Sequence, residues 1–171
     1  IGNTGTAFYN HPWFKQADII HFQWVHHGFV SLKGLKKTLQ SDKHVVWTMR
    51  DMWLSTSICH YTYSCDKFKT ECQSCPFLNS SMHKDLSYRT WKKKLFINKS
   101  GLNIVTLSSW LEGQVQKSAI TKGLKTFVIP NMTDTSVFRS SDQSEARQKW
   151  NLPLNKKIII MGAVKLNDPI K

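Results

Sequence analysis

The feature that most constrains this chain is the stretch 45–76, which begins as an apolar segment and then carries all four cysteines. After Arg50 and Asp51 it shows little helical periodicity. Long irregular segments inside compact domains are commonly either functional or disordered, and the Trp, Tyr, Phe and Cys content argues against disorder. Because α/β proteins place their sites in loops that follow strand ends, we expect a functional cysteine loop over residues 50–78.

The cysteines Cys59, Cys65, Cys72 and Cys75 are spaced Cys-x5-Cys-x6-Cys-x2-Cys. Only the last spacing is common among metal ligands. A Zn²⁺ ion bound by the four thiolates would hold an irregular loop in one shape. Two disulfides or reduced buried thiols are the alternatives, and His60 is an alternative ligand beside Cys59. We favour the metal site over these alternatives, because a bound ion would explain how an irregular loop keeps one shape.

Apolar segments alternate with helical patterns on both sides of the cysteine loop. Such alternation is typical of a parallel sheet joined by right-handed helical crossovers. We therefore predict an α/β fold with a Rossmann-like parallel sheet. The expected strands are 19–25, 45–49, 103–108 and 126–129, and the expected helices are 8–16, 32–40, 87–99, 110–119 and 145–151. We expect Ser31 to cap the helix 32–40 and Ser109 to cap the helix 110–119.

The composition changes after residue 134. Residues 135–155 are polar and contain one short helical pattern, whereas 156–163 form an apolar segment that predicts a new strand. A strand is not stable without neighbours. We therefore expect a first domain over 1–134, a linker over 135–155, and the truncated start of a second domain over 156–171. The chain begins with Ile1 rather than Met, and we expect it to be a fragment.

The chain carries a formal charge of +13 and has a sequence pI of about 9.7. This balance favours phosphate-bearing partners such as anionic lipid or phosphorylated small molecules. Nucleic acid is disfavoured because no nucleic-acid-binding motif is present, and no apolar run is long enough to span a membrane. We expect peripheral attraction to a membrane through basic helix faces, formed by Lys33, Lys36, Lys37, Arg89, Lys92, Lys93 and Lys94.

Polar side chains follow the first two expected strands. His21, His26 and His27-Gly28 lie at the end of the first, and Arg50 and Asp51 follow the second. The carboxyl ends of parallel strands meet at one edge of a sheet, where ligands bind. The alternative to a ligand site is that the histidines are ordinary packed or exposed residues. In that case Asp51 would cap a turn and Arg50 would form an ordinary ion pair.

Four stretches resemble bacterial family 4 glycosyltransferases of the GT-B fold, in the subgroup that builds capsule, O-antigen and exopolysaccharide chains. ADIIHFQWVHHGFVSL is similar to the family's ADIIHLHW-x-HGG-F-x-SL. VVWTMRDMW, followed by CHY, CDKFKT and CQSCP, is similar to the family's VVWTLHDMW and cysteine loop. Residues 129–131 with Asp134 and Phe138 are similar to the interdomain IPNGID-x-x-F, and IIIMGA with Asp168-Pro169 is similar to the start of the second domain.

The resemblance implies transfer of a sugar from a nucleotide-sugar donor to a glycan or lipid-linked acceptor. The second domain would bind the donor, any zinc would be structural, and the isolated fragment would be inactive. The enzyme would be cytoplasmic, at the inner face of the membrane. The first domain would receive the acceptor, through His26, His27, Gly28, Arg50, Asp51 and Trp53.

This chain departs from the family pattern where Arg50 replaces a histidine. Arginine is always charged and cannot act as a base, but it can hold a phosphate or carboxylate. The segment 55–58 replaces Thr-Gly-Gly, and Met132 replaces the glycine of IPNGID. The alternative function is a non-enzymatic, zinc-stabilised binding module for an anionic partner.

Overall fold

The structure is a computed structural model that describes residue 5 and residues 7–80 and 82–162. The chain divides into two compact units, residues 1–131 and residues 132–171. The first unit contains the sheet and the cysteine loop, and each unit is described by itself below.

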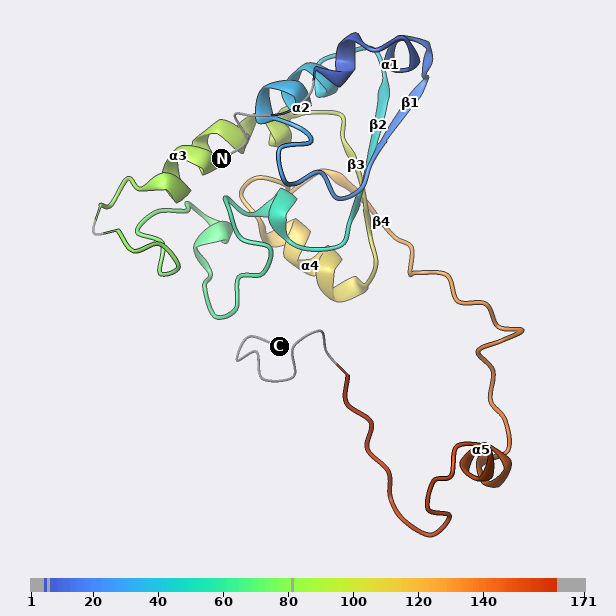
Figure 1. Ribbon diagram of the computed structural model, residues 1–171. Coiled ribbons are helices and arrows are strands. Elements are labelled where there is room, and N and C mark those ends of the chain that lie inside the picture. The colour runs from blue at the N-terminus through green and yellow to red at the C-terminus, as the bar shows by residue number, and fades with distance from the viewer. Residues whose placement is uncertain (1–4, 6, 81, 163–171) are drawn as a thin grey trace. The chain divides into compact units, whose positions relative to one another are not determined.

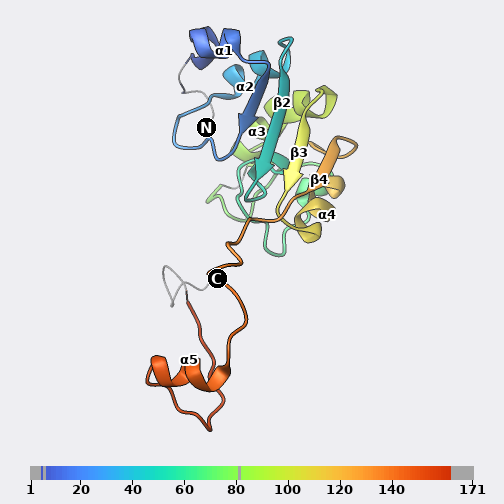
Figure 2. The ribbon, with the colours of Figure 1, turned by 90° about the vertical axis from the view of Figure 1, so that its right-hand side faces the viewer.

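The sheet of the first unit has four parallel strands in the order β1-β2-β3-β4 (Figure 2). They are β1 (Ile19–Phe22), β2 (His44–Met49), β3 (Asn103–Thr106) and β4 (Lys125–Val128). The predicted α/β class with a Rossmann-like parallel sheet is therefore confirmed. Each strand follows the preceding one in sequence, so every connection is a crossover between neighbouring strands.

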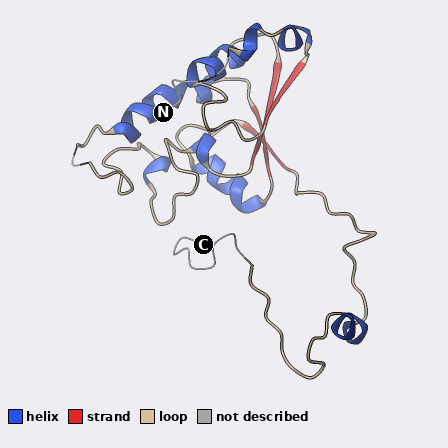
Figure 3. Ribbon diagram, viewed as in Figure 1, coloured by secondary structure: helices blue, strands red, loops and turns tan. Residues whose placement is uncertain are grey.

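The three main helices are α2 (Leu32–Leu39), α3 (Leu86–Lys94) and α4 (Ser109–Lys117). They lie on the same side of the sheet (Figures 1 and 3), and the view onto the strands places them behind the sheet (Figure 2). When spatial order follows chain order, crossovers of one hand place their helices on one face. The sheet face toward these helices therefore forms the core.

The core is built from inward-facing strand residues and the apolar faces of α2 and α4. β2 contributes alternate buried side chains, because successive residues of a strand point to opposite faces. Its neighbours on the helices and on β3 are almost fully buried. The set includes Val45, Trp47, Met49, Leu35, Ile104 and Val115.

Most expected elements are present, with shifted ends. β1 ends at Phe22 rather than at residue 25, because its pairing with β2 ends at Trp47. The expected helix 8–16 is divided into η1 (Phe8–Asn10) and α1 (Pro12–Gln16). The predicted N-cap Ser31 is confirmed, since its hydroxyl accepts a hydrogen bond from the Gly34 N–H at 3.0 Å.

Two helix predictions need correction. The expected helix 87–99 is α3 followed by a 3₁₀ helix, η4 (Leu95–Lys99), in which hydrogen bonds tighten to three-residue spacing. The N-cap of α4 is Ser108 rather than Ser109, because the Ser108 hydroxyl accepts from the Leu111 N–H at 3.3 Å. Ser109 is the first helical residue.

The second unit contains α5 (Gln143–Lys149), whose N-cap Asp142 accepts a hydrogen bond from the Glu145 N–H at 2.9 Å. The strand predicted over 156–163 is wrong for residues 156–162, which form no strand. Pairing defines a strand, and among the described residues the sheet contains only β1 to β4, so this segment has no pairing partner. Residue 163 lies outside the described part.

Candidate functional site

The cysteine loop of residues 50–78 connects β2 to α3 without a regular helix longer than one turn. It contains two short 3₁₀ helices, η2 (Trp53–Ser55) and η3 (Lys67–Lys69). Phe68 of η3 is buried in the core, and its carbonyl oxygen accepts a hydrogen bond from the Ala119 N–H at 3.1 Å. Core packing and these backbone bonds therefore fix the loop against the end of α4.

Lys94, at the end of α3, is fully buried beneath this loop. Its ammonium group donates hydrogen bonds to the carbonyl oxygens of Trp53, of Thr56 at 2.8 Å and of Ser57 at 3.4 Å. It also lies 3.5 Å from the centroid of the Trp53 ring. Burial lowers the pKa of Lys94 well below its ordinary value. The prediction that Lys94 belongs to a basic outer face is therefore wrong.

Asp85, the N-cap of α3, holds the other end of the loop and is also fully buried. It accepts hydrogen bonds from the Cys75 N–H at 2.7 Å, the Ser87 hydroxyl at 2.6 Å and the Tyr88 N–H at 3.1 Å. Burial raises the pKa of Asp85, but these hydrogen bonds lower it more, so the pKa lies below its ordinary value of 3.8. Asp85 thus links α3 directly to a cysteine.

Replacing Asp85 with alanine is expected to lower the free energy of unfolding by about 2–4 kcal/mol, because it removes a helix cap and leaves buried donors unpaired. Thermal unfolding measures the change. The matched control is Asp142→Ala, an exposed cap with one such bond, for which about 1 kcal/mol or less is expected. Equal effects of the two substitutions would contradict the role of Asp85.

The same contacts predict a pH dependence. The folded-state pKa of Asp85 is depressed, so its contribution to stability is fully present above the unfolded-state value and is lost as pH falls through the folded-state value. The stability difference between the wild type and Asp85→Ala should therefore shrink as the pH falls below about 4. A constant difference down to pH 2 would show that the ionised carboxylate is not the stabilising form.

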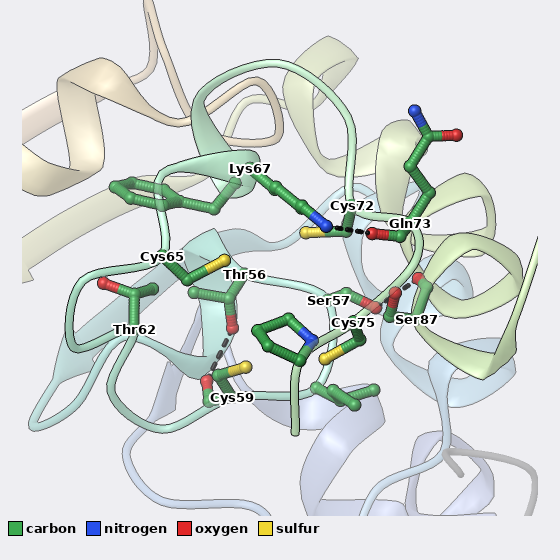
Figure 4. A pocket seen from close by; sticks show the side chains of 13 residues that line it. Thr56, Ser57, Cys59, Thr62, Cys65, Lys67, Cys72, Gln73, Cys75 and Ser87 are labelled. Atoms are coloured by element: carbon green, nitrogen blue, oxygen red, sulfur yellow. Dashed lines mark hydrogen bonds between the residues drawn. The ribbon is translucent and has the colours of Figure 1, made fainter. Parts of the chain in front are cut away.

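The four cysteines line one small pocket inside the loop, with their sulfur atoms directed into it (Figure 4). All four are free thiols, so the disulfide alternative is not the arrangement in this structure. Burial, with the neighbouring thiols, raises the pKa of Cys59 to about 12, and burial raises that of Cys72 to about 11. In the absence of a cation the Cys59 and Cys72 thiols are therefore protonated at neutral pH.

The pocket fits a zinc ion in its donor set and its size. The cavity has a volume of about 20 Å³, which accommodates one water or ion. Tetrahedral zinc with bonds of about 2.3 Å requires sulfur–sulfur separations of about 3.8 Å. Within the described residues, no three of the sulfurs all lie within 4.8 Å of one another. Binding would therefore draw the sulfurs together, and the zinc site remains a prediction.

A second group of residues, called here the carboxyl-edge group, lies at the carboxyl edge of the sheet and joins three separate segments. His26 comes from the β1–α2 loop, Asp51 follows β2, and His60 lies in the cysteine loop. The His60 Nδ1 lies 2.7 Å from the Asp51 Oδ2, and the rings of His26 and His60 are 4.4 Å apart between centroids. Burial, followed by His60, lowers the pKa of His26 to about 4, so His26 is neutral at pH 7.

Two tryptophans enclose this group. The Trp24 ring lies 4.8 Å from the ring of His26 and 5.0 Å from that of His27, centroid to centroid. The Trp53 ring meets the His26 ring edge to face at 4.6 Å. Trp53 is buried, whereas Trp24 is 49% exposed. The group therefore packs against one buried tryptophan, Trp53, and against one solvent-accessible tryptophan, Trp24.

Arg50 lies beside this group but makes a different set of contacts. Its Nε donates to the Gln23 side chain and its Nη1 donates to the Asn131 side chain, both at 3.2 Å. No ion pair of Arg50 is present in the described part of the chain, so the ion-pair alternative is wrong. These two neutral partners leave its charge available to an anion. The bond to Asn131 also connects Arg50 to the segment 129–131 that follows β4.

The other predicted residues are placed differently. Asp51 does cap a turn, since its Oδ1 accepts from the Trp53 N–H at 2.8 Å, and the same carboxylate also pairs with His60. His21 lies within β1 and bonds to the Thr48 hydroxyl at 2.8 Å, outside the carboxyl-edge group. His27 and Gly28 both have positive φ, 56° and 80°, in the turn that brings the backbone past this edge.

Sequence reasoning missed two residues of this site. His60 was considered only as a substitute zinc ligand, whereas its ring lies against Asp51 and His26. Trp24 was not selected, although its position just beyond a strand end is a usable signal. Its half-exposed ring lies against the rings of His26 and His27, which makes it a candidate binding residue.

The fold is an α/β domain, and the carboxyl-edge group lies where parallel sheets of this class place ligand sites. The chain is 34% identical over 68 residues to "Putative colanic acid biosynthesis glycosyl transferase WcaC" of Escherichia coli (strain K12). The match covers 36% of this chain and 17% of that protein. No protein-family model and no solved structure matches the chain. The similarity thus relates part of the chain to a protein named as a glycosyl transferase.

Among the described residues, no helix combines the length and the apolar character needed to cross a membrane.

Proposed function

We propose that this chain is the acceptor-side part of a family 4 glycosyltransferase of the GT-B type. The enzyme would transfer a hexose from a nucleotide-sugar donor to a glycan or lipid-linked acceptor in surface polysaccharide synthesis. The observation that carries the proposal is the convergence of Trp24, His26, Asp51 and His60 at the carboxyl edge of the sheet. The partial similarity to a named glycosyl transferase supports the reaction class.

The chemistry of the carboxyl-edge group suits a sugar. Carbohydrates present apolar ring faces and hydroxyl groups, and ligand sites combine aromatic surfaces with a few placed polar groups. Trp24 supplies an exposed ring, and His60 with Asp51 supplies hydrogen-bonding groups. Arg50 would hold a phosphate or carboxylate of the acceptor. His27 and Gly28 would present their backbone to it.

The basic outer surface fits an acceptor carried by a lipid. Six of the seven basic residues predicted on helix faces are exposed, and the exception is Lys94. Lysine and arginine near an anionic membrane surface each contribute about 1 kcal/mol of attraction. Peripheral attachment at the cytoplasmic face would bring the carboxyl-edge group close to a lipid-linked acceptor. The exposed residues are Lys33, Lys36, Lys37, Arg89, Lys92 and Lys93.

The donor would be bound by a second domain that begins near residue 156, after the linker of residues 135–155. We expect the 171-residue chain to bind acceptor but not to turn over a nucleotide sugar. Incubation with UDP-glucose and UDP-galactose, followed by chromatographic detection of free UDP, tests this expectation. Turnover by this chain would overturn the proposed division of labour.

Replacing Trp24 with alanine is expected to weaken glycan binding about tenfold, because one aromatic contact is worth about 1–1.5 kcal/mol. Binding is measured on an array of bacterial surface-polysaccharide fragments. The matched control is Trp13→Ala, since Trp13 is 79% exposed on α1, which precedes β1 and lies away from the carboxyl edge.

A wild-type chain that binds no glycan on the array, but binds anionic vesicles, would favour the non-enzymatic binding module. Equal losses in Trp24→Ala and Trp13→Ala would show that the carboxyl edge is not the glycan site. Loss confined to Trp24→Ala would support the proposal.

A further inference from the structure

The carboxyl-edge group has the composition of a metal site as well as of a sugar site. Within the described part of the chain, one set of three His, Cys, Asp or Glu residues has ligand atoms that all lie within 4.8 Å of one another. That set is His26, Asp51 and His60, called here the His–Asp–His group. Two imidazoles and one carboxylate are a donor set used by zinc and other first-row transition metals.

Each member of the His–Asp–His group is held in place by a contact outside the group. The Asp51 Oδ1 accepts a hydrogen bond from the Trp53 N–H at 2.8 Å, which leaves Oδ2 facing His60. The His60 carbonyl oxygen accepts from the Met52 N–H at 2.8 Å. His26 is wedged between two tryptophan rings. Ligands fixed by surrounding packing lose little conformational freedom when an ion binds.

The group is reachable from solvent but partly enclosed. The His60 side chain is 43% exposed and the Asp51 side chain is 15% exposed. No hydrogen bond to the His26 ring is present among the described residues, so its ring nitrogens are available to coordinate an ion. The tryptophan walls limit water on one side, and the open side leaves coordination positions for water or another oxygen ligand.

We propose that His26, Asp51 and His60 bind a divalent transition-metal ion with three protein ligands. The ion would take the place of the hydrogen between the His60 Nδ1 and the Asp51 Oδ2, and the displaced proton would pass to solvent. Its open coordination positions would face the edge where ligands approach the sheet. This proposal is independent of the glycosyltransferase assignment, because it concerns only the ion and the three side chains.

Cobalt titration of the reduced, metal-free 171-residue chain tests the proposal. Calorimetry gives the number of Co²⁺ ions bound. Visible absorption separates ions bound by thiolates, which produce intense charge-transfer bands, from ions bound by nitrogen and oxygen ligands. We expect the wild type to bind about one equivalent more than His60→Ala. In that variant, affinity at this group should fall at least about tenfold, while any thiolate band keeps its intensity.

Two further variants make the result decisive. Asp51→Asn keeps the shape of the side chain and can still accept from the Trp53 N–H, so it should fold even if His60→Ala does not. It should lose the same equivalent of cobalt. His83→Ala is the matched control, because His83 is exposed and lies outside the group. Equal cobalt binding by the wild type and Asp51→Asn would overturn the proposal, and so would an equal loss in His83→Ala.

The two proposals fail separately. Loss of glycan binding in Trp24→Ala with unchanged cobalt binding would support the sugar site. The cobalt binding of His60→Ala and Asp51→Asn would then decide the metal site. Wild-type cobalt binding without glycan binding would retain the metal site and reject the acceptor role.

Discussion

Replacing Lys94 with alanine is expected to lower the free energy of unfolding by about 3–5 kcal/mol. The ammonium group of Lys94 bonds to the carbonyl oxygens of Trp53, Thr56 and Ser57 from a fully buried position. Alanine leaves these acceptors without a donor and leaves a cavity where the side chain lay. The expected fall in melting temperature is about 10 °C for a chain of this size.

The substitution should also disturb the carboxyl-edge group. The Trp53 ring contacts both the Lys94 ammonium and the His26 ring. When the lysine is replaced, the Trp53 ring loses its contact with the ammonium group. The position of the neighbouring His26 ring should then be less well defined. We therefore expect Lys94→Ala to weaken glycan binding as well as stability.

Two variants control for this effect. Lys92→Ala removes an exposed lysine from the same helix, and its ammonium lies 5.6 Å from the Tyr88 ring centroid. Its expected cost is about 0.5 kcal/mol or less. Lys94→Met keeps most of the volume but removes the donors, so its cost should fall between the two. A melting temperature of Lys94→Ala equal to that of Lys92→Ala would contradict the buried role of Lys94.

Removing zinc from the cysteine loop is expected to lower the melting temperature by about 10 °C. An ion that binds only the folded chain, at about 1,000 times its dissociation constant, contributes about 4 kcal/mol. The loop contains few regular elements, so a four-thiolate ion would add a restraint to the contacts with Lys94 and Asp85. Elemental analysis should find about one tightly held zinc per chain, and thermal unfolding with and without EDTA should show the shift.

The control for chelation is Cys72→Ser, which removes one of the four sulfur ligands that line the pocket. Without EDTA, this variant should already have the lower melting temperature expected of the EDTA-treated wild type. Adding EDTA should not lower it further. It also separates the cysteine loop from the His–Asp–His group, which it leaves intact. Four freely titrating thiols in a native chain without zinc would remove the zinc prediction and leave reduced buried thiols as the correct alternative.

Hydrophobic patterning was sufficient to predict the parallel sheet, because periodicity is a local property of the sequence. The four strands are present, and the predicted Ser31 cap accepts its hydrogen bond. The ends of the elements were less well predicted. β1 ends where its pairing with β2 ends, and pairing is a long-range property that the residues after Phe22 do not reveal.

The cysteine loop illustrates the same division. Its spacing predicted that four cysteines act together, and the structure places all of them around one pocket. The spacing could not show that Asp85 connects to Cys75 by a hydrogen bond, since that contact depends on how α3 enters the fold.

The sequence alone determined the α/β class, the position of the loop between the second strand and the next helix, and the placement of polar residues after strand ends. Only the tertiary structure decided that Lys94 is buried and that His60 joins His26 and Asp51. The reason is physical. Strand and helix patterns come from neighbouring residues, whereas burial of a charge and convergence of three distant segments depend on how the whole chain packs.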